Sequence, residues 1–165
     1  MEKRPIINIK PTKTDNLIEL IGYLILFAFW LTSIVTYNYL PEQIPIHYNG
    51  FGEVDNYGKK TSIFLLPIIS SFLFVILSLI NKNPESLNYN VEITEQNAEN
   101  QYRNSIKMMR IMKIIIVIIF FMIDIETISI AMKKSEGLGV WFLPSTLSII
   151  FIPIVYFALK SKKMK

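Results

Sequence analysis

The sequence has no cysteine and a single histidine, His47, in 165 residues. The absence of cysteine excludes disulfides and thiolate metal ligands within the chain. A zinc site normally needs three or four good ligands, so one imidazole with nearby carboxylates leaves a structural metal as a weak alternative. A catalytic triad is weaker still, because no serine lies close to His47 in the sequence. We therefore expect no catalytic residue, no metal and no cofactor, and a protein that is not an enzyme.

Charge is also scarce. Only 18% of the residues are charged and 52% are hydrophobic, and the mean hydropathy is +0.39. Soluble domains contain ~25% charged residues, so this is the composition of a membrane protein. The net charge of +4 comes from lysines and arginines beside the apolar runs, where they meet lipid head groups. The expected partner is therefore the lipid bilayer and not nucleic acid.

Four apolar runs are each about long enough to cross a hydrocarbon layer of ~30 Å. They lie at residues 17–39, 61–80, 111–132 and 141–159. The first run ends in an aromatic segment, which is typical of an uncleaved helix at the membrane interface and not of a signal peptide. The sequence thus predicts an all-α membrane protein: a single domain at 17–160 with four transmembrane helices, between tails at 1–16 and 161–165. Such a bundle could also be one protomer of a homo-oligomer.

The basic residues are distributed unequally between the two sides of the predicted membrane. Most of them lie in the N-terminal tail, in residues 81–113 and in the C-terminal tail, and the exceptions are Lys59, Lys60, Lys133 and Lys134. The positive-inside rule then places both termini in the cytoplasm. The loop between the first two spans, residues 40–60, is expected to face outward.

The predicted cytoplasmic segment, residues 81–110, carries two local patterns. Alternating apolar residues at 87–93 predict a short strand. After them, apolar residues recur on one helical face, with a basic stripe rotated away from that face: Arg103, Lys107, Arg110 and Lys113. This pattern predicts an amphipathic helix on a membrane surface before the third span. A helix that extends the third span into solvent explains it equally well.

The polar loop at 40–60 has the composition of a segment with one specified shape. Pro45 favours extended backbone before it, and Asn49-Gly50 is a strong turn dipeptide. We expect a hairpin-like cap over the ends of the helices, with Phe51, Val54 and Tyr57 packed inward. The candidate recognition residues are Pro45, His47, Asn49, Gly50, Gly52 and Asp55. The alternative is that His47 and Asp55 bond to each other or to turn amides and only hold the loop in shape.

Two acids, Asp124 and Glu126, fall within the third apolar run. A charged acid near the bilayer centre costs ~3 kcal/mol on insertion scales, so it usually faces protein or a wet cavity. Residues two apart on a helix are separated by ~200°, so these two acids cannot share one face. We expect Asp124 to be neutral or bonded to hydroxyl groups of other spans (Thr32, Ser33, Ser70 or Ser71). Glu126 could reach Lys59, Lys60 or His47. Helix packing, a proton or cation relay, and a ligand site all remain open for this pair.

The loop carries the motif Leu40-Pro41-x-x-Ile44-Pro45-Ile46-His47-Tyr48-Asn49-x-x-Gly52-Glu53-x-Asp55-x-Tyr57-Gly58-x-Lys60. It resembles the signature of a bacterial membrane family of unknown function that is shared with the N-terminal part of SdpI-type immunity proteins. Residues 93–103 are similar to short, stand-alone members of that family. The SdpI-type proteins protect a producing cell from its own secreted toxic peptide and hold a transcriptional repressor at the membrane, and they are longer, with additional spans. By resemblance, the six candidate residues of the loop are signature positions, and no catalytic role comes with them.

Together these patterns and the resemblance predict a multi-pass protein of the bacterial inner membrane whose outward loop recognises a secreted peptide, a lipid or a membrane partner protein. The alternative is a small transporter or a proton- or cation-coupled membrane component that uses Asp124 and Glu126.

Overall fold

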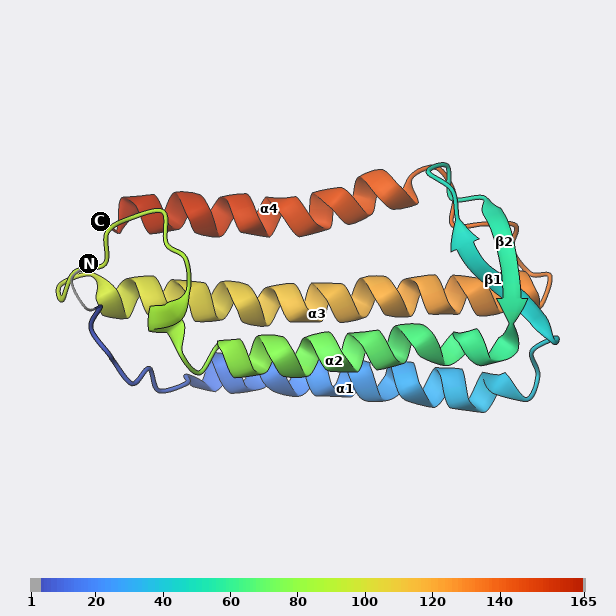
Figure 1. Cartoon of the computed structure of the whole chain (residues 1–165), viewed down its shortest axis with the longest axis horizontal. Coiled ribbons are helices and arrows are strands. Elements are labelled where there is room, and N and C mark those ends of the chain that lie inside the picture. Colours follow the sequence, from blue (N-terminus) through green and yellow to red (C-terminus); the bar gives the residue numbers. More distant parts are fainter. Residues whose placement is uncertain (1–3, 165) are drawn as a thin grey trace.

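The computed structural model describes residues 4–164, so residues 1–3 and 165 of the predicted tails lie outside the described part of the chain. Four α-helices run along its long axis, with a small hairpin at one end (Figure 1). The α-helices are α1 (Lys13–Tyr37), α2 (Leu65–Ile80), α3 (Ala98–Ala131) and α4 (Phe142–Lys163). The strands are β1 (Gln43–Tyr48) and β2 (Val54–Lys59), and short 3-10 turns lie at η1 (Lys60–Phe64) and η2 (Pro84–Ser86).

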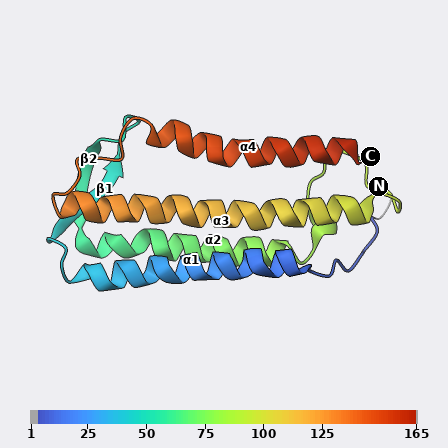
Figure 2. The ribbon, with the colours of Figure 1, turned by 180° about the vertical axis from the view of Figure 1, so that it is seen from behind.

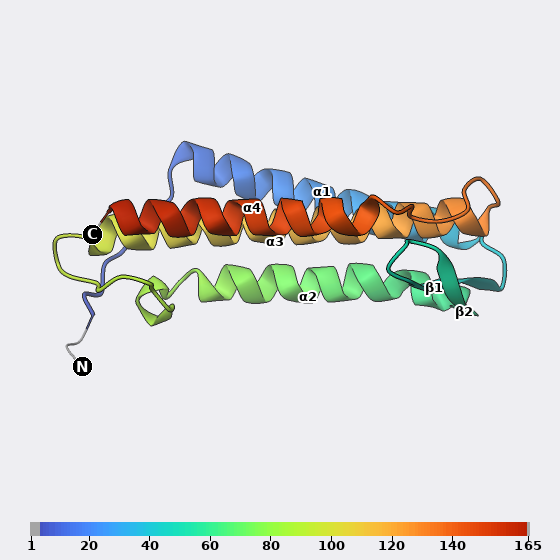
Figure 3. The same ribbon diagram turned by 90° about the horizontal axis from the view of Figure 1, so that it is seen from above.

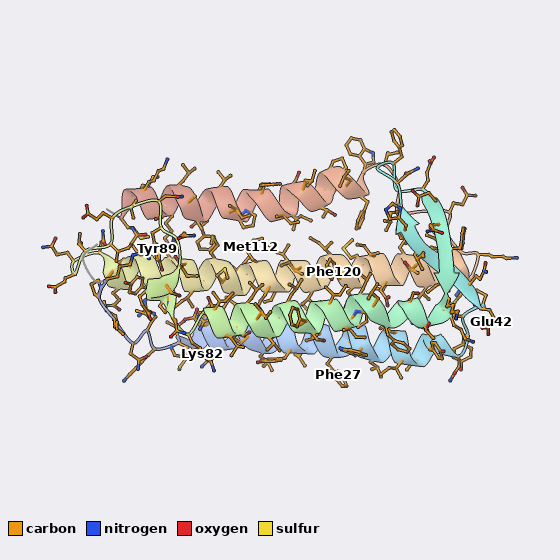
Figure 4. All side chains as sticks on the ribbon, in the orientation of Figure 1. Phe27, Glu42, Lys82, Tyr89, Met112 and Phe120 are labelled. Atoms are coloured by element: carbon orange, nitrogen blue, oxygen red, sulfur yellow. The ribbon has the colours of Figure 1, made fainter. Side chains whose placement is uncertain are left out.

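All four helical segments are long and apolar enough to cross a membrane, which confirms the predicted fold class. The first helix begins earlier than its apolar run, because Thr12 and Asp15 form a capping box that satisfies backbone N–H groups of the first turn. Many large apolar side chains point away from the bundle, as Phe27 does in Figure 4, where it is 66% exposed. Such outward apolar surface is what a lipid environment requires.

The third helix is the centre of the bundle. It packs against α1, α2 and α4, whereas α4 rests mainly on α3 (Figures 2 and 3). Phe29, Phe74 and Val117 form a buried cluster where the first three helices meet. The fourth helix is therefore the least enclosed element of the bundle.

The segment before the third span differs in part from its predicted structure. Residues 98–110 form the first turns of the 34-residue helix α3, so the interpretation as a helix that extends the third span is confirmed and the one of a separate amphipathic helix is wrong. The predicted apolar face is correct: Ala98, Tyr102 and Ile106 are buried. The strand predicted at 87–93 is wrong, since this stretch has no regular structure.

The predicted hairpin is present as a two-stranded antiparallel sheet, β1 with β2, across one end of the bundle (Figure 1). It is anchored by a buried apolar cluster of Leu40, Ile44, Ile63 and Ile128. The inward packing predicted for the aromatic residues is wrong, because Phe51 is 68% exposed and Tyr57 is 53% exposed. The hairpin is held by its β1 side and presents aromatic side chains outward.

Both ends of the described chain lie at the opposite end of the bundle from the hairpin, here called the terminal end (Figure 1). The N-terminal segment packs on that end instead of hanging free. Arg4 donates to the carbonyl oxygens of Glu85 and Leu87 at 2.9 and 2.6 Å, and the Tyr102 hydroxyl donates to the carbonyl of Pro5 at 2.9 Å.

Candidate functional site

The turn of the hairpin is built around Asn49. Its side-chain oxygen accepts hydrogen bonds from the backbone N–H groups of Phe51 (2.9 Å) and Glu53 (3.1 Å). Its side-chain nitrogen donates to the Glu53 carboxylate at 2.8 Å. A short amide side chain that bonds to following backbone groups is the usual way in which Asn fixes a turn. Asn49 therefore sets the shape of residues 49–53.

His47 and Asp55 face each other across the two strands, with 2.6 Å between Nδ1 and Oδ1. Both side chains are largely exposed, at 67% and 41%. Within residues 4–164, no group of three or more His, Asp or Glu side chains is placed to hold a metal ion. This pair ties the strands together while it leaves the imidazole open to solvent and to a ligand.

The hairpin docks on the loop between α3 and α4. The backbone N–H of Leu138 donates to the carbonyl of Gly52 at 2.8 Å. Glu53 and Gly137 form an isolated antiparallel β-bridge. Gly52 has a φ of +79°, and a Cβ added there would lie 2.5 Å from the carbonyl oxygen of Gly139. Only glycine fits both that conformation and that approach. The α3–α4 loop therefore serves as the dock of the hairpin.

A third contact joins the hairpin to the middle helix. The hydroxyl groups of Tyr48 and Thr127 lie 2.7 Å apart. Burial raises the pKa of the Tyr48 phenol, so it stays protonated and able to share a hydrogen bond. The hairpin is thus fixed to both α3 and the α3–α4 loop.

Between the hairpin and the bundle lies a pocket of about 350 Å³. Four of the six candidate residues line it: His47, Asn49, Gly50 and Gly52. The opposite wall is apolar and comes from α3, the docking loop and the start of α4, through Ile123, Leu138, Phe142 and Leu143. We call this the hairpin pocket. The other two candidates, Pro45 and Asp55, do not line it.

A second, smaller cavity of about 130 Å³ also borders β1 and reaches Asp124. Its walls include Pro45 and Tyr48 from the hairpin and Ile63 from the turn that precedes α2. Asp124 is only 1% exposed, and Ser33 of α1 donates to its carboxyl at 2.8 Å. Ser33 was among the hydroxyl partners predicted for this acid.

The two intramembrane acids are not brought together. Glu126 accepts a hydrogen bond from Ser135, in the α3–α4 loop, and not from the lysines or the histidine predicted as its partners. Asp124 points instead toward α1 and the small cavity. This separation agrees with the ~200° expected between two residues that are two positions apart on a helix.

The terminal end holds a charged cluster that the sequence did not reveal, made of Asp15, Glu19, Arg110 and Lys113. Arg110 contacts Asp15 at 2.8 Å and Glu19 at 3.0 Å. Lys113 is fully buried, 2.5 Å from Glu19, and lies over the ring of Phe74. Two members of the predicted basic stripe therefore face inward and not toward a membrane surface, because α1 presents two acids one turn apart.

Next to this cluster is a cavity of about 520 Å³, walled on one side by the N-terminal segment. Both polar atoms of the Asn81 side chain are buried in its wall without a hydrogen-bond partner in the described chain. No local sequence pattern marks this cavity, because its wall comes from segments that are distant in the chain.

The family model that matches this chain covers the hairpin. Residues 24–70 match the model of a domain of unknown function, DUF1648. That segment comprises the second half of α1, the whole hairpin and the start of α2. The apolar wall of the hairpin pocket, formed by α3 and α4, lies outside the matched residues.

Two relatives are similar in sequence. An uncharacterised protein of Archaeoglobus fulgidus is 29% identical over 92 residues, which cover 49% of this chain and 50% of the relative. The immunity protein SdpI of Bacillus subtilis is 31% identical over 62 residues, which cover 38% of this chain and 30% of SdpI. The chain thus spans half of the first relative and less than a third of the second. No solved structure matches. The resemblance predicted from the loop is confirmed: residues 24–70 of this membrane protein match DUF1648, and the chain is similar in sequence to the immunity protein SdpI.

Proposed function

We propose that this chain is a non-enzymatic membrane protein that recognises an apolar segment of a secreted peptide in the hairpin pocket, in the manner of an immunity protein. The observation that carries the proposal is the position of the signature residues His47, Asn49, Gly50 and Gly52 in the wall of one pocket. Its volume of about 350 Å³ falls within the range of ligand pockets, ~300–1,000 Å³.

The chemistry of the pocket favours a peptide. One wall offers polar side chains and glycine backbone, which suit peptide N–H and C=O groups, and the other offers the apolar surface of Ile123, Phe142 and Leu143. The predicted orientation supports access from outside, because the basic segments lie at the terminal end and the hairpin at the other. The name of the relative SdpI, an immunity protein, supports the same class of role.

The proposal is tested by challenging bacteria that lack or express the chain with a panel of secreted antimicrobial peptides. We expect expression to raise the inhibitory concentration of at least one peptide several-fold. Leu143→Trp should fill the pocket and abolish protection. Leu147→Trp, one turn further along α4 and outside the pocket wall, is the matched control. Unchanged sensitivity across the panel, or full protection by Leu143→Trp, would refute peptide recognition at this site.

A second candidate function is proton coupling through Asp124, favoured by the cavity that reaches this buried carboxyl. If ionisation of Asp124 is required, Asp124→Asn should abolish the protection that expression of the chain gives. The free energy of unfolding should stay within about 1 kcal/mol of that of the parent, because the amide can still accept the Ser33 hydrogen bond. If the variant matches the parent in both stability and phenotype, the carboxyl acts in helix packing.

A further inference from the structure

A groove of about 370 Å³ runs between α3 and α4 near the terminal end, away from the hairpin pocket. It is lined by Lys107 and Ile111 of α3 and by Ile152, Tyr156, Phe157 and Lys160 of α4. The α3 residues are one turn apart, and those of α4 fall on successive turns at 152, 156–157 and 160, so each helix presents one stripe to the groove. The walls of the groove are thus mostly apolar, and each of the two helices contributes one lysine to them.

The groove begins where a polar clamp between the two helices ends. Gln101 donates to the carbonyl of Ser161 at 2.9 Å and accepts from its hydroxyl at 2.7 Å. Asn104 donates to the carbonyl of Phe157 at 3.0 Å. Beyond the clamp, Pro153 interrupts the hydrogen bonding of α4, and α3 is the main neighbour of that helix. Ile152 and Tyr156 are 67% and 58% exposed, so this part of the groove is open to the lipid phase.

The basic residues of α3 outside the groove are all paired with acids. Arg103 pairs with Glu99, and Arg110 and Lys113 pair with the acids of α1. Within residues 4–164, neither Lys107 nor Lys160 forms an ion pair, and both are exposed. An apolar groove with two free cations complements a molecule that has an acyl chain and an anionic head group.

We propose that this groove binds one membrane phospholipid with an anionic head group. Lys107 and Lys160 hold the phosphate, and an acyl chain lies against Ile111, Ile152 and Tyr156. The predicted orientation places these lysines at the cytoplasmic leaflet, where anionic lipids attract basic residues by about 1 kcal/mol per cation. This site is independent of peptide recognition at the other end of the bundle.

The test is a lipid titration of the purified full-length protein in detergent, followed by thermal unfolding. Phosphatidylglycerol should raise the melting temperature in a saturable way, whereas phosphatidylcholine and inorganic phosphate should not. The choline group of phosphatidylcholine balances the charge of its phosphate, and inorganic phosphate has no acyl chain. Lys107→Gln and Lys160→Gln should each raise the half-saturating concentration of phosphatidylglycerol about fivefold. Ile152→Trp, on an exposed position of the groove wall, should weaken binding without loss of charge.

Lys162→Gln and Lys163→Gln are the matched controls, because they remove the same charge from the last turn of α4 but lie outside the groove. Both should leave the titration unchanged. Equal effects of phosphatidylglycerol and phosphatidylcholine would overturn the proposal. So would an equal loss in the control and groove lysine variants, which would indicate attraction to the whole basic surface. Stabilisation by inorganic phosphate alone would indicate a simple anion site.

Discussion

Gly52→Ala is expected to detach the hairpin from the α3–α4 loop. The added Cβ would lie 2.5 Å from the Gly139 carbonyl oxygen, and the residue would have to keep a φ of +79°. A left-handed conformation and an overpacked contact each cost ~1–3 kcal/mol, so we expect a loss of about 2–5 kcal/mol in docking. Hydrogen exchange at the Leu138 amide, which donates to Gly52, should rise more than tenfold.

Gly50→Ala is the matched control for this prediction. It lies two residues away in the same turn, and an added Cβ there meets no atom within 4 Å. In this variant, hydrogen exchange at the Leu138 amide should match that of the parent. The thermal stability should be equal or slightly higher, because alanine restricts the unfolded chain. Equal behaviour of the two variants would show that the Gly52–Gly139 approach does not hold the hairpin.

Glu19→Gln is expected to cost about 3 kcal/mol of stability at the terminal end. The substitution leaves the fully buried Lys113 with Ser78 as its remaining polar partner and removes one of the two carboxylates of Arg110. An uncompensated buried charge is strongly destabilising, whereas an exposed pair contributes little. Thermal unfolding in detergent measures the difference.

Glu99→Gln provides the comparison, since it breaks the exposed pair with Arg103 on the same helix as Lys113. We expect it to cost no more than about 0.5 kcal/mol. If both variants unfold at the same temperature, the charged cluster does not stabilise the bundle.

Much of the fold could be predicted from local patterns. The four apolar runs gave the spanning helices, and Asn49-Gly50 gave the position of the hairpin turn. The partner of Asp124, Ser33, was also among those expected, because a buried acid within a span needs a hydrogen-bond donor from a neighbouring span. These features depend on nearby residues or on simple membrane energetics.

The misses share a physical cause, which is that each depends on a partner distant in the chain. The stripe of Arg110 and Lys113 looks surface-directed until α1 brings Asp15 and Glu19 against it. The outward position of Phe51 and Tyr57 follows from the docking of the hairpin on the α3–α4 loop, which no local pattern encodes. For the same reason, the pocket could not be assembled before α3 and α4 were placed.

A hairpin pocket that faces outward and receives a peptide can be probed with a single reactive thiol. Because the chain has no cysteine, a single introduced thiol reports on one position. Gly50→Cys lines the pocket in open space, and Phe51→Cys lies beside it on the exposed tip. The most direct measurement is the rate at which a membrane-impermeant maleimide labels Gly50→Cys in intact cells, with and without the peptide against which the chain protects. We expect Gly50→Cys to be labelled from outside the cell and to be labelled more slowly when the peptide is present. The peptide should slow the labelling of Phe51→Cys less than that of Gly50→Cys. Labelling only after permeabilisation, or an unchanged rate with the peptide, would contradict this expectation.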